Sequence, residues 1–197
     1  MKRFLLTACL LAGLCLGAAA ESSAVKFLGI PVDGPESEFA AQLKSKGFTY
    51  YSGLYEGVFN GRDVTVSIVC NKGLVRRVCV NFPSTDSETD IRLQYNSLLR
   101  QFQANSKYME FPVNETLDES EDISYELSVH DKRYQAIFYY FDPARFNPET
   151  RYKDAMQALL KGEPADGDVW FMISSSPGYY ILLFYDNPRN EAHGEDL

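Results

Sequence analysis

The chain has 197 residues, a formal net charge of −8 and 45% hydrophobic residues, values typical of one globular domain or two very small ones. Aromatic residues make up 14%, which is enough to build a sizeable core and excludes a disordered chain. The acidic balance, with no basic stripe, argues against nucleic acid as a partner, because a polyanion would be repelled.

The segment 1–20 has the pattern of a secretory signal peptide. A basic start is followed by an apolar run to Leu16, and Ala18-Ala19-Ala20 has the form of a cleavage site. We expect cleavage after Ala20, which predicts export to the periplasm or the cell exterior as residues 21–197. The alternative is a lipid anchor at Cys9, although only five residues separate Cys9 from the basic pair. No later segment has the roughly 20 apolar residues that a transmembrane helix needs.

Two cysteines, Cys70 and Cys79, remain after this cleavage, in a compartment where disulfides form. Both lie in one predicted hairpin. If Asn71 faces Val75 across the turn, Cys79 lies about 10 Å along the strand from the residue opposite Cys70, at ~3.4 Å per residue. Because a disulfide needs Cα atoms within about 7 Å, we predict no Cys70–Cys79 bond.

A helix is predicted over residues 35–47. Pro35 suits the first helical position, and acidic residues follow it at the positive end of the helix dipole. Phe39 and Leu43 share one face, and Gly47 provides the left-handed residue that ends a helix.

A three-stranded meander follows, with strands 54–59 and 62–70 joined by Asn60-Gly61 and a third strand after Lys72-Gly73. Pairing across both turns places these apolar residues on one face: Tyr55, Phe59, Val64, Val66, Ile68, Cys70, Val78, Val80 and Phe82. The other face carries Glu56, Thr65, Ser67, Arg77 and Cys79. This alternation predicts a sheet with one covered and one solvated face.

A second helix is predicted from about residue 86 to 104, after a capping box formed by Thr85 and Glu88. Its apolar residues recur at helical spacing: Ile91, Tyr95, Leu98, Leu99 and Phe102. We expect this helix to cover the meander.

Strands are predicted at 123–129, where apolar and polar residues alternate, and at 133–141. The last hairpin pairs 169–175 with 179–186 around Pro177-Gly178. Both of its strands are apolar on both faces, which is typical of central strands.

A third helix is predicted over residues 148–161, with Asn147 as its N-cap and Gly162 after its end. The residues expected to point inward are Tyr152, Ala155, Met156, Leu159 and Leu160.

No linker rich in glycine, serine or proline divides the chain, so we expect a single α+β domain over residues 21–197. The predicted architecture is an antiparallel sheet of meanders covered by about three helices. A coarse repetition of strands and helices also allows a tandem of two α+β units, residues 25–105 and 106–190, that share one sheet.

The sequence contains no recognisable catalytic set, and we predict no catalytic residue. A nucleophile needs a base, yet the only histidines are His130, beside Asp131 at a predicted strand end, and His193 in the tail. Cys79 is expected on the solvated face without a neighbour that would lower its pKa. The serines 174–176 precede a proline-glycine turn and do not form a nucleophile elbow.

No metal-binding or cofactor-binding motif is present either. The acidic run Asp118, Glu119, Glu121 and Asp122 is interpreted as a solvated loop, with weak calcium binding as the alternative. Glycines 57 and 61 belong to a hairpin and do not form a phosphate-binding loop.

Aromatic residues are the remaining indication of function: Tyr50, Tyr51, Tyr139, Tyr140, Trp170, Tyr179 and Tyr180. Neighbours on a strand point to opposite faces, so one residue of each adjacent pair would be exposed on an open sheet and could stack on a sugar or anchor a protein interface. The interpretation we prefer for these residues is that helices cover both faces of the sheet and bury them.

Two segments, FLGIPVDGPESEFAAQLKSKGF near the start and YDNPRNEAHGEDL at the end, resemble those of a family of secreted proteins of Bacteroidetes-type envelopes. This likeness implies no activity, cofactor or site residue. The order of helices and strands also resembles the tandem α+β units of beta-lactamase-inhibitor-protein-like and outer-membrane-assembly lipoprotein folds. That resemblance implies binding of other proteins, by analogy of fold alone.

Together these observations favour a secreted or periplasmic noncatalytic module that binds an envelope protein or glycan through its sheet. The alternative is a small secreted hydrolase that acts on cell-envelope glycans through a pair of carboxylates. A sheet face left open by the helices would support the first function, and a deep pocket with two facing acidic residues would support the second.

Overall fold

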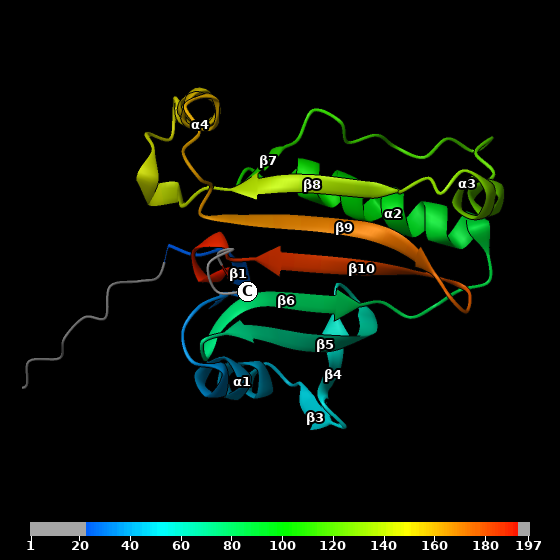
Figure 1. Cartoon of the computed structure of the whole chain (residues 1–197), viewed down its shortest axis with the longest axis horizontal. Coiled ribbons are helices and arrows are strands. Elements are labelled where there is room, and N and C mark those ends of the chain that lie inside the picture. The colour runs from blue at the N-terminus through cyan, green and yellow to red at the C-terminus, as the bar shows by residue number, and fades with distance from the viewer. Residues whose placement is uncertain (1–22, 193–197) are drawn as a thin grey trace, which may run out of the picture.

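The computed structural model describes residues 23–192 and contains an eight-stranded antiparallel sheet and four α-helices, an α+β fold (Figure 1). The predicted signal peptide, the cleavage site, Cys9 and His193 lie outside the described residues. Within residues 23–192, none of the helices is both long enough and apolar enough to cross a bilayer.

The strands of the large sheet follow the order β3-β4-β5-β6-β10-β9-β8-β7. Their bounds are β3 Thr49–Tyr51, β4 Leu54–Phe59, β5 Arg62–Asn71, β6 Leu74–Asn81, β7 Tyr108–Glu110, β8 Gln135–Tyr140, β9 Gly167–Ser175 and β10 Tyr179–Asp186. A separate small sheet pairs β1 Lys26–Phe27 with β2 Ile30–Pro31. Residues 25–105 thus contribute β3 to β6 and residues 106–190 contribute β7 to β10, and the two sets meet where β6 pairs with β10.

The predicted meander is confirmed by the strand pairing. Val66 is the partner of Tyr55 on β4 and of Val80 on β6, and all three side chains are buried on one face. Gly57 is needed beneath the ring of Phe48, because a Cβ at residue 57 would lie 2.5 Å from Phe48 Cδ1. The hydrophobic alternation therefore selects the register of the sheet.

The register of the β5–β6 hairpin matches the prediction from Thr65 to Val69 and differs by one residue next to the turn. A bulge between Val69 and Cys70 leaves Arg76 as the extra residue of β6, so Cys70 pairs with Val75 and not with Arg76. Cys79 pairs with Ser67 further along the hairpin. Both cysteines are free.

Helix α1 (Glu36–Ser45) matches its prediction closely. Phe39 and Leu43 are its buried residues, and the chain turns back after it so that the Phe48 N–H donates to the Leu43 carbonyl at 3.3 Å. The ring of Phe27 from β1 packs between Phe48 at 6.3 Å and Tyr185 of β10 at 5.3 Å between centroids. The β1–β2 ribbon and α1 thereby cover the β4–β6 side of the sheet.

Helix α2 (Glu88–Gln103) buries its five predicted apolar residues and passes behind the strands in Figure 1. Tyr95 packs on Phe171 and Phe102 on Phe138, each pair with ring centroids 5.1 Å apart. The N-cap is Ser87, whose hydroxyl accepts from the Asp90 N–H, while Thr85 Oγ1 accepts from the Ser87 N–H. The predicted cap at Thr85 thus lies two residues before the observed N-cap.

The segment 123–129 is helix α3 (Ile123–Val129), so the prediction of a strand was wrong. The Asp122 carboxylate accepts from the Tyr125 N–H and caps the helix. Ile123 is buried and Leu127 packs against the same core, a spacing of four that suits one helical face as well as an alternating strand. Capping and tertiary burial decide between the two.

Helix α4 (Arg151–Leu160) begins three residues later than predicted, because the Asn147 side chain instead accepts from the Glu149 N–H in a turn. Tyr152 and Leu160, which were expected to point inward, are 66% and 80% exposed. Only Ala155 and Ala158 of α4 are buried, in a small cluster with Met109, Phe141 and Ala165. Met156 and Leu159 are half-buried and pack against this cluster as predicted, whereas Tyr152 and Leu160 remain outside. The small side chains of Ala155 and Ala158 let the helix approach one corner of the sheet closely.

Candidate functional site: the open face of the sheet

The two faces of the sheet differ completely in burial. On the face toward α2 the alternate residues of β8, β9 and β10 are buried, whereas their neighbours on the opposite face are all half-buried. We call this opposite side the open face. From β5 to β8 its half-buried residues are Thr65, Ser67, Val69, Arg77, Cys79, Tyr180, Leu182, Phe184, Asp186, Asp168, Trp170, Met172, Ser174, Gln135, Ile137 and Tyr139.

The described helices leave the centre of the open face uncovered (Figure 1). Helix α4 reaches only its corner, where Tyr139 packs against the cluster around Ala155. The expectation that helices cover both faces and bury the aromatic residues was therefore wrong. Because the small residues of α4 dock at the sheet edge, α1, α2 and α3 are left to form a layer on one face only.

An aromatic pair with an arginine occupies the middle of the open face. Trp170 of β9 and Phe184 of β10 are Cα partners, and their rings stack with centroids 4.0 Å apart and planes 17° apart. The Arg77 guanidinium carbon lies 5.2 Å from the Phe184 centroid and 5.6 Å from the Trp170 centroid. These distances are in the range of cation–π contacts.

The same cluster holds one carboxylate in place. Asp186 accepts from Arg77 Nε at 2.5 Å, from Arg77 Nη2 at 2.7 Å and from Trp170 Nε1 at 2.8 Å. The hydrogen bonds to Asp186 raise the pKa of Arg77. A bidentate pair of this kind fixes both side chains, so the cluster is a rigid feature of the surface.

A second carboxylate, Asp168, lies directly across from Asp186 on β9. Burial and the neighbouring charges of Asp186 and Glu191 raise the pKa of Asp168 to about 6. Its Oδ1 atom is inaccessible to solvent and has no hydrogen-bond partner among the described residues. The neutral form of Asp168 is therefore favoured at mildly acidic pH.

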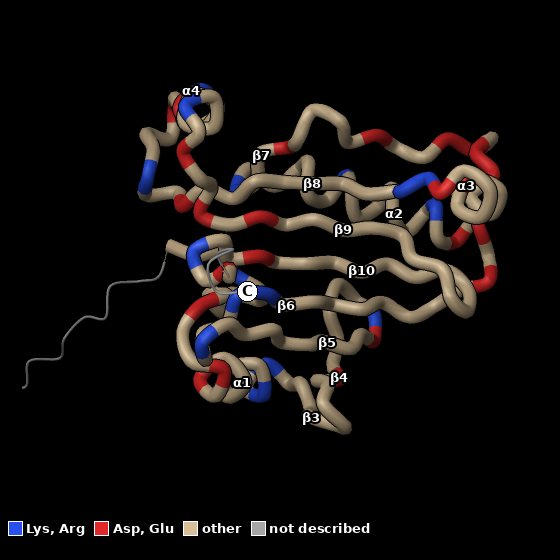
Figure 2. The backbone as a smooth tube through the Cα atoms, in the orientation of Figure 1, with Lys and Arg blue, Asp and Glu red and all other residues tan. Residues whose placement is uncertain are grey.

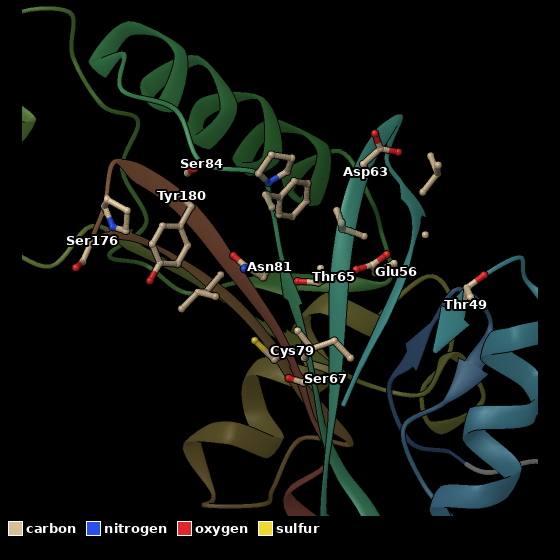
Figure 3. A pocket seen from close by; sticks show the side chains of 18 residues that line it. Thr49, Glu56, Asp63, Thr65, Ser67, Cys79, Asn81, Ser84, Ser176 and Tyr180 are labelled. Carbon is tan, nitrogen blue, oxygen red and sulfur yellow. The ribbon is translucent and has the colours of Figure 1, made fainter. Parts of the chain in front are cut away.

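A groove with a volume of about 1070 Å³ lies beside this cluster, at the β4 side of the open face. Glu56 and Asp63 lie on one side of it and Tyr180 and Ser176 on the other, with Asn81 between them (Figure 3). The floor is formed by residues from β5, β6 and β10: Thr65, Ser67, Cys79, Asn81 and Leu182. Burial raises the pKa of the Cys79 thiol, which therefore stays protonated on this surface.

The rim of the groove carries exposed apolar side chains from the β3–β4 hairpin. Leu54 is 41% exposed and Val58 is 62% exposed, and both line the groove. Tyr51 of β3, which pairs with Leu54, is 69% exposed at the edge of the sheet. Large apolar side chains grouped on a rim in this way are typical of interaction surfaces.

The predicted aromatic candidates are distributed between burial and exposure. Tyr50 and Tyr51 are both exposed, whereas in the pair on β8 Tyr140 is buried and Tyr139 half-buried. Tyr179 and Tyr180 are both half-buried. Tyr139, Trp170 and Tyr180 lie on the open face.

His130 lies apart from the open face, and the serines lie where β9 turns to β10 at the edge of this face. His130 ends α3, where its Nδ1 lies 3.1 Å from Glu126 Oε2 and its ring contacts Tyr125. The serines 174–176 end β9 and begin the turn to β10, and Ser176 lies on the groove rim. This placement gives neither residue type a catalytic partner that the structure records.

The acidic run makes structural contacts. Asp118 accepts from the Ser120 hydroxyl at 2.6 Å, and Asp122 caps α3. Glu121 accepts from Lys132 and from the Tyr134 hydroxyl at 2.6 Å, which lowers the pKa of Glu121. In the part of the chain that the structure describes, no three side chains of histidine, cysteine, aspartate or glutamate gather into a metal site.

Figure 2 shows that charged residues are sparse along the middle of the central strands and gather at the strand ends, loops and helices. The open face thus combines an apolar and hydroxyl-bearing centre with a few charges at defined positions. Comparison with protein families, with curated proteins and with solved structures found no match to this chain. The two resemblances noted from the sequence stay predictions.

Proposed function

We propose that this protein is a noncatalytic binding module that engages a partner protein through the open face of its sheet. The observation that carries the proposal is that the helices of residues 23–192 leave the centre of the open face uncovered, where Trp170, Phe184 and Arg77 are held in fixed positions. Tryptophan and arginine are enriched among the residues that dominate binding energy at protein interfaces.

The geometry of the aromatic pair supports a protein partner over a sugar. Because Trp170 and Phe184 stack face to face at 4.0 Å, each ring covers one face of the other. A sugar platform needs an open ring face; the stack leaves one per ring, and the Arg77 guanidinium also lies 5.6 and 5.2 Å from the two centroids. A protein surface can instead pack against ring edges and the neighbouring Leu182 and Met172. The tandem α+β folds that this chain resembles in element order also bind other proteins.

The alternative function, a hydrolase acting on envelope glycans, needs two carboxyl groups that share a cavity. Asp168 and Asp186 face each other across β9 and β10, and Asp168 has the raised pKa of a general acid. However, Asp186 is occupied by Arg77 and Trp170, and neither carboxyl lines the groove. These contacts favour a structural role for the pair.

Export of the protein is part of the same proposal. It is supported by the pattern of residues 1–20. Expression of the full chain in a Gram-negative host, followed by mass spectrometry of the periplasmic protein, is expected to yield a chain that begins at Glu21. A lipid-modified Cys9 at the N-terminus would instead support the anchored alternative.

The binding function is tested by a photo-crosslinking residue placed on the surface. Met172→p-benzoylphenylalanine puts the probe on the open face, and the same substitution at Leu160, which is 80% exposed on α4, is the matched control. In the native envelope we expect a discrete adduct from residue 172 that residue 160 does not give. The adduct partner, identified by mass spectrometry and purified, should bind the wild-type protein and lose affinity for Trp170→Ala. Equal adducts from both positions, or unchanged affinity, would reject the proposal.

A further inference from the structure

The charged side chains that line the groove beside the aromatic cluster are all acidic. Among residues 23–192, Glu56 and Asp63 are the only charged residues that line it, both are exposed, and no lysine or arginine of this part of the chain lines it. A cationic group in the groove would therefore contact two carboxylates without repulsion from a basic side chain of the groove lining. The chain's net charge of −8 adds to the attraction.

The remaining lining provides apolar contact next to these carboxylates. Leu54 and Val58 lie on the same side of β4 as Glu56, and Leu182, Pro83 and Pro177 line the groove as well. The alternation of a strand places Glu56 between the two apolar side chains. A ligand that lies along β4 thus meets apolar, acidic and apolar groups in turn.

The size of the groove sets the kind of ligand. Its volume of about 1070 Å³ slightly exceeds the ~300–1,000 Å³ of small-molecule sites, and it opens broadly toward solvent. A single metal ion or small cation would leave most of it empty. Several consecutive side chains of a polypeptide would fill it.

We propose that the groove binds an extended segment of the partner protein whose groove-facing side chains, at every second residue, are apolar, basic (lysine or arginine) and apolar in turn. This inference rests on the proposed binding function and adds the partner's chemistry and its place on the surface. The cationic side chains contact Glu56 and Asp63, and the apolar ones pack on Leu54, Val58 and Leu182.

A second copy of this chain is a poorer occupant. Its groove rim carries the same two carboxylates, and the whole chain is acidic, so two copies would repel each other at this site. Sedimentation velocity therefore accompanies the test. A dimer that Val58→Thr disrupts would overturn the proposal in favour of self-association.

The test uses two synthetic hexapeptides, acetylated and amidated. One has the sequence Leu-Ser-Lys-Ser-Val-Lys, which places leucine, lysine and valine on one face of an extended chain, and the other has glutamate in place of each lysine. Titrations into the mature protein are followed by amide chemical shifts. We expect the basic peptide to shift residues of the groove floor, such as Thr65 and Asn81, and the acidic peptide to shift none of them. Raising the salt from about 50 to about 500 mM should weaken the binding.

Charge variants separate the groove from general attraction to an acidic protein. Glu56→Gln with Asp63→Asn should weaken the basic peptide about fivefold, the effect of two exposed ion pairs. Glu119→Gln with Glu149→Gln, which removes the same charge from exposed acids that do not line the groove, should leave the affinity within about twofold.

Apolar variants test the rim in the same way. Val58→Thr should weaken the peptide, while Val113→Thr is the control, because the two valines are 62% and 61% exposed. Equal weakening by the groove and control variants, or shifts spread over the whole surface, would refute the inference. An adduct from residue 172 that persists in the Glu56→Gln, Asp63→Asn protein would then show that the binding function stands without the basic segment.

Discussion

Arg77 and Asp186 are Cα partners on β6 and β10, and two hydrogen bonds of 2.5 and 2.7 Å join their side chains across the open face. The pair links the strands at which the two halves of the sheet meet. The Arg77 and Asp186 side chains are 27% and 18% exposed, so the ion pair is largely shielded from water. The contact is both a structural link and a part of the proposed binding surface.

Replacement of Arg77 by methionine is expected to lower the free energy of unfolding by about 2 to 3 kcal/mol, because Asp186 would keep only Trp170 as a donor in a half-buried position. Urea denaturation of the mature protein at pH 7 measures this change. The free energy of unfolding of Arg77→Lys should lie between those of the wild type and Arg77→Met, because lysine retains the charge but not the forked geometry of arginine. A loss below about 0.5 kcal/mol for Arg77→Met would contradict a stabilising role for the pair.

Asp168 makes the stability depend on pH in a direction opposite to that of most carboxyl groups. Its pKa in the folded protein is about 6, above the ordinary value of 3.8, so the folded state favours the protonated form. At pH values below 3.8, Asp168 is protonated in both the folded and the unfolded state, so its ionisation does not change the free energy of unfolding. As the pH rises from about 4 to about 6, ionisation destabilises the fold by up to about 3 kcal/mol, and above that range the cost is constant.

Asp168→Asn removes this ionisation and should therefore raise the free energy of unfolding by up to about 3 kcal/mol at pH 7, and by little at pH 4. Urea denaturation at the two pH values provides the comparison. Asp63→Asn, an exposed aspartate, should change little at either pH. An Asp168→Asn protein with the same gain at both pH values would indicate that packing, and not ionisation, is responsible.

Much of the fold follows from alternation and turn chemistry in the sequence. Asn60-Gly61 and Lys72-Gly73 mark the two turns, and the apolar alternation selects the face that contains Val66 and Val80. The strand prediction for segment 123–129 is wrong because the spacing of Ile123 and Leu127 fits both a helix and a strand. The cap from Asp122 becomes decisive only when α3 packs against the core.

The candidate site is harder to predict because it depends on which strands become neighbours. The pairing of Asp168 with Asp186 could have been found, since both follow from extending the predicted β9–β10 hairpin by one residue at its open end. The approach of Arg77 could not, because β6 and β10 are about a hundred residues apart in the chain and nothing local specifies their pairing. The open face likewise depends on where α4 docks.

Gly57 is predicted to tolerate no side chain. A Cβ there would lie 2.5 Å from Cδ1 and 2.7 Å from Cγ of Phe48, whose ring is buried against Phe27. Gly57→Ala is therefore expected to lower the free energy of unfolding by about 1 to 3 kcal/mol, measured by urea denaturation. Val58→Ala, at the next residue of the same strand but exposed, should cost only about 0.5 kcal/mol.

A double-mutant cycle identifies the contact. In the Phe48→Leu background the ring is absent, so the added cost of Gly57→Ala should be clearly smaller than in the wild type. Additive losses would show that residue 57 is intolerant for a reason other than the Phe48 ring.

The two cysteines of the described chain are expected to stay free and to react slowly with alkylating reagents at pH 7. Burial, followed by the nearby Glu36 carboxylate, raises the pKa of Cys70, and burial raises that of Cys79, so the thiolate fraction is small in both. Iodoacetamide labelling followed by peptide mapping should show slow modification of the native protein and rapid modification of both thiols in urea. Because Cys70 pairs with Val75 and Cys79 with Ser67, a Cys70–Cys79 crosslink in a non-reducing map would contradict the β5–β6 register itself.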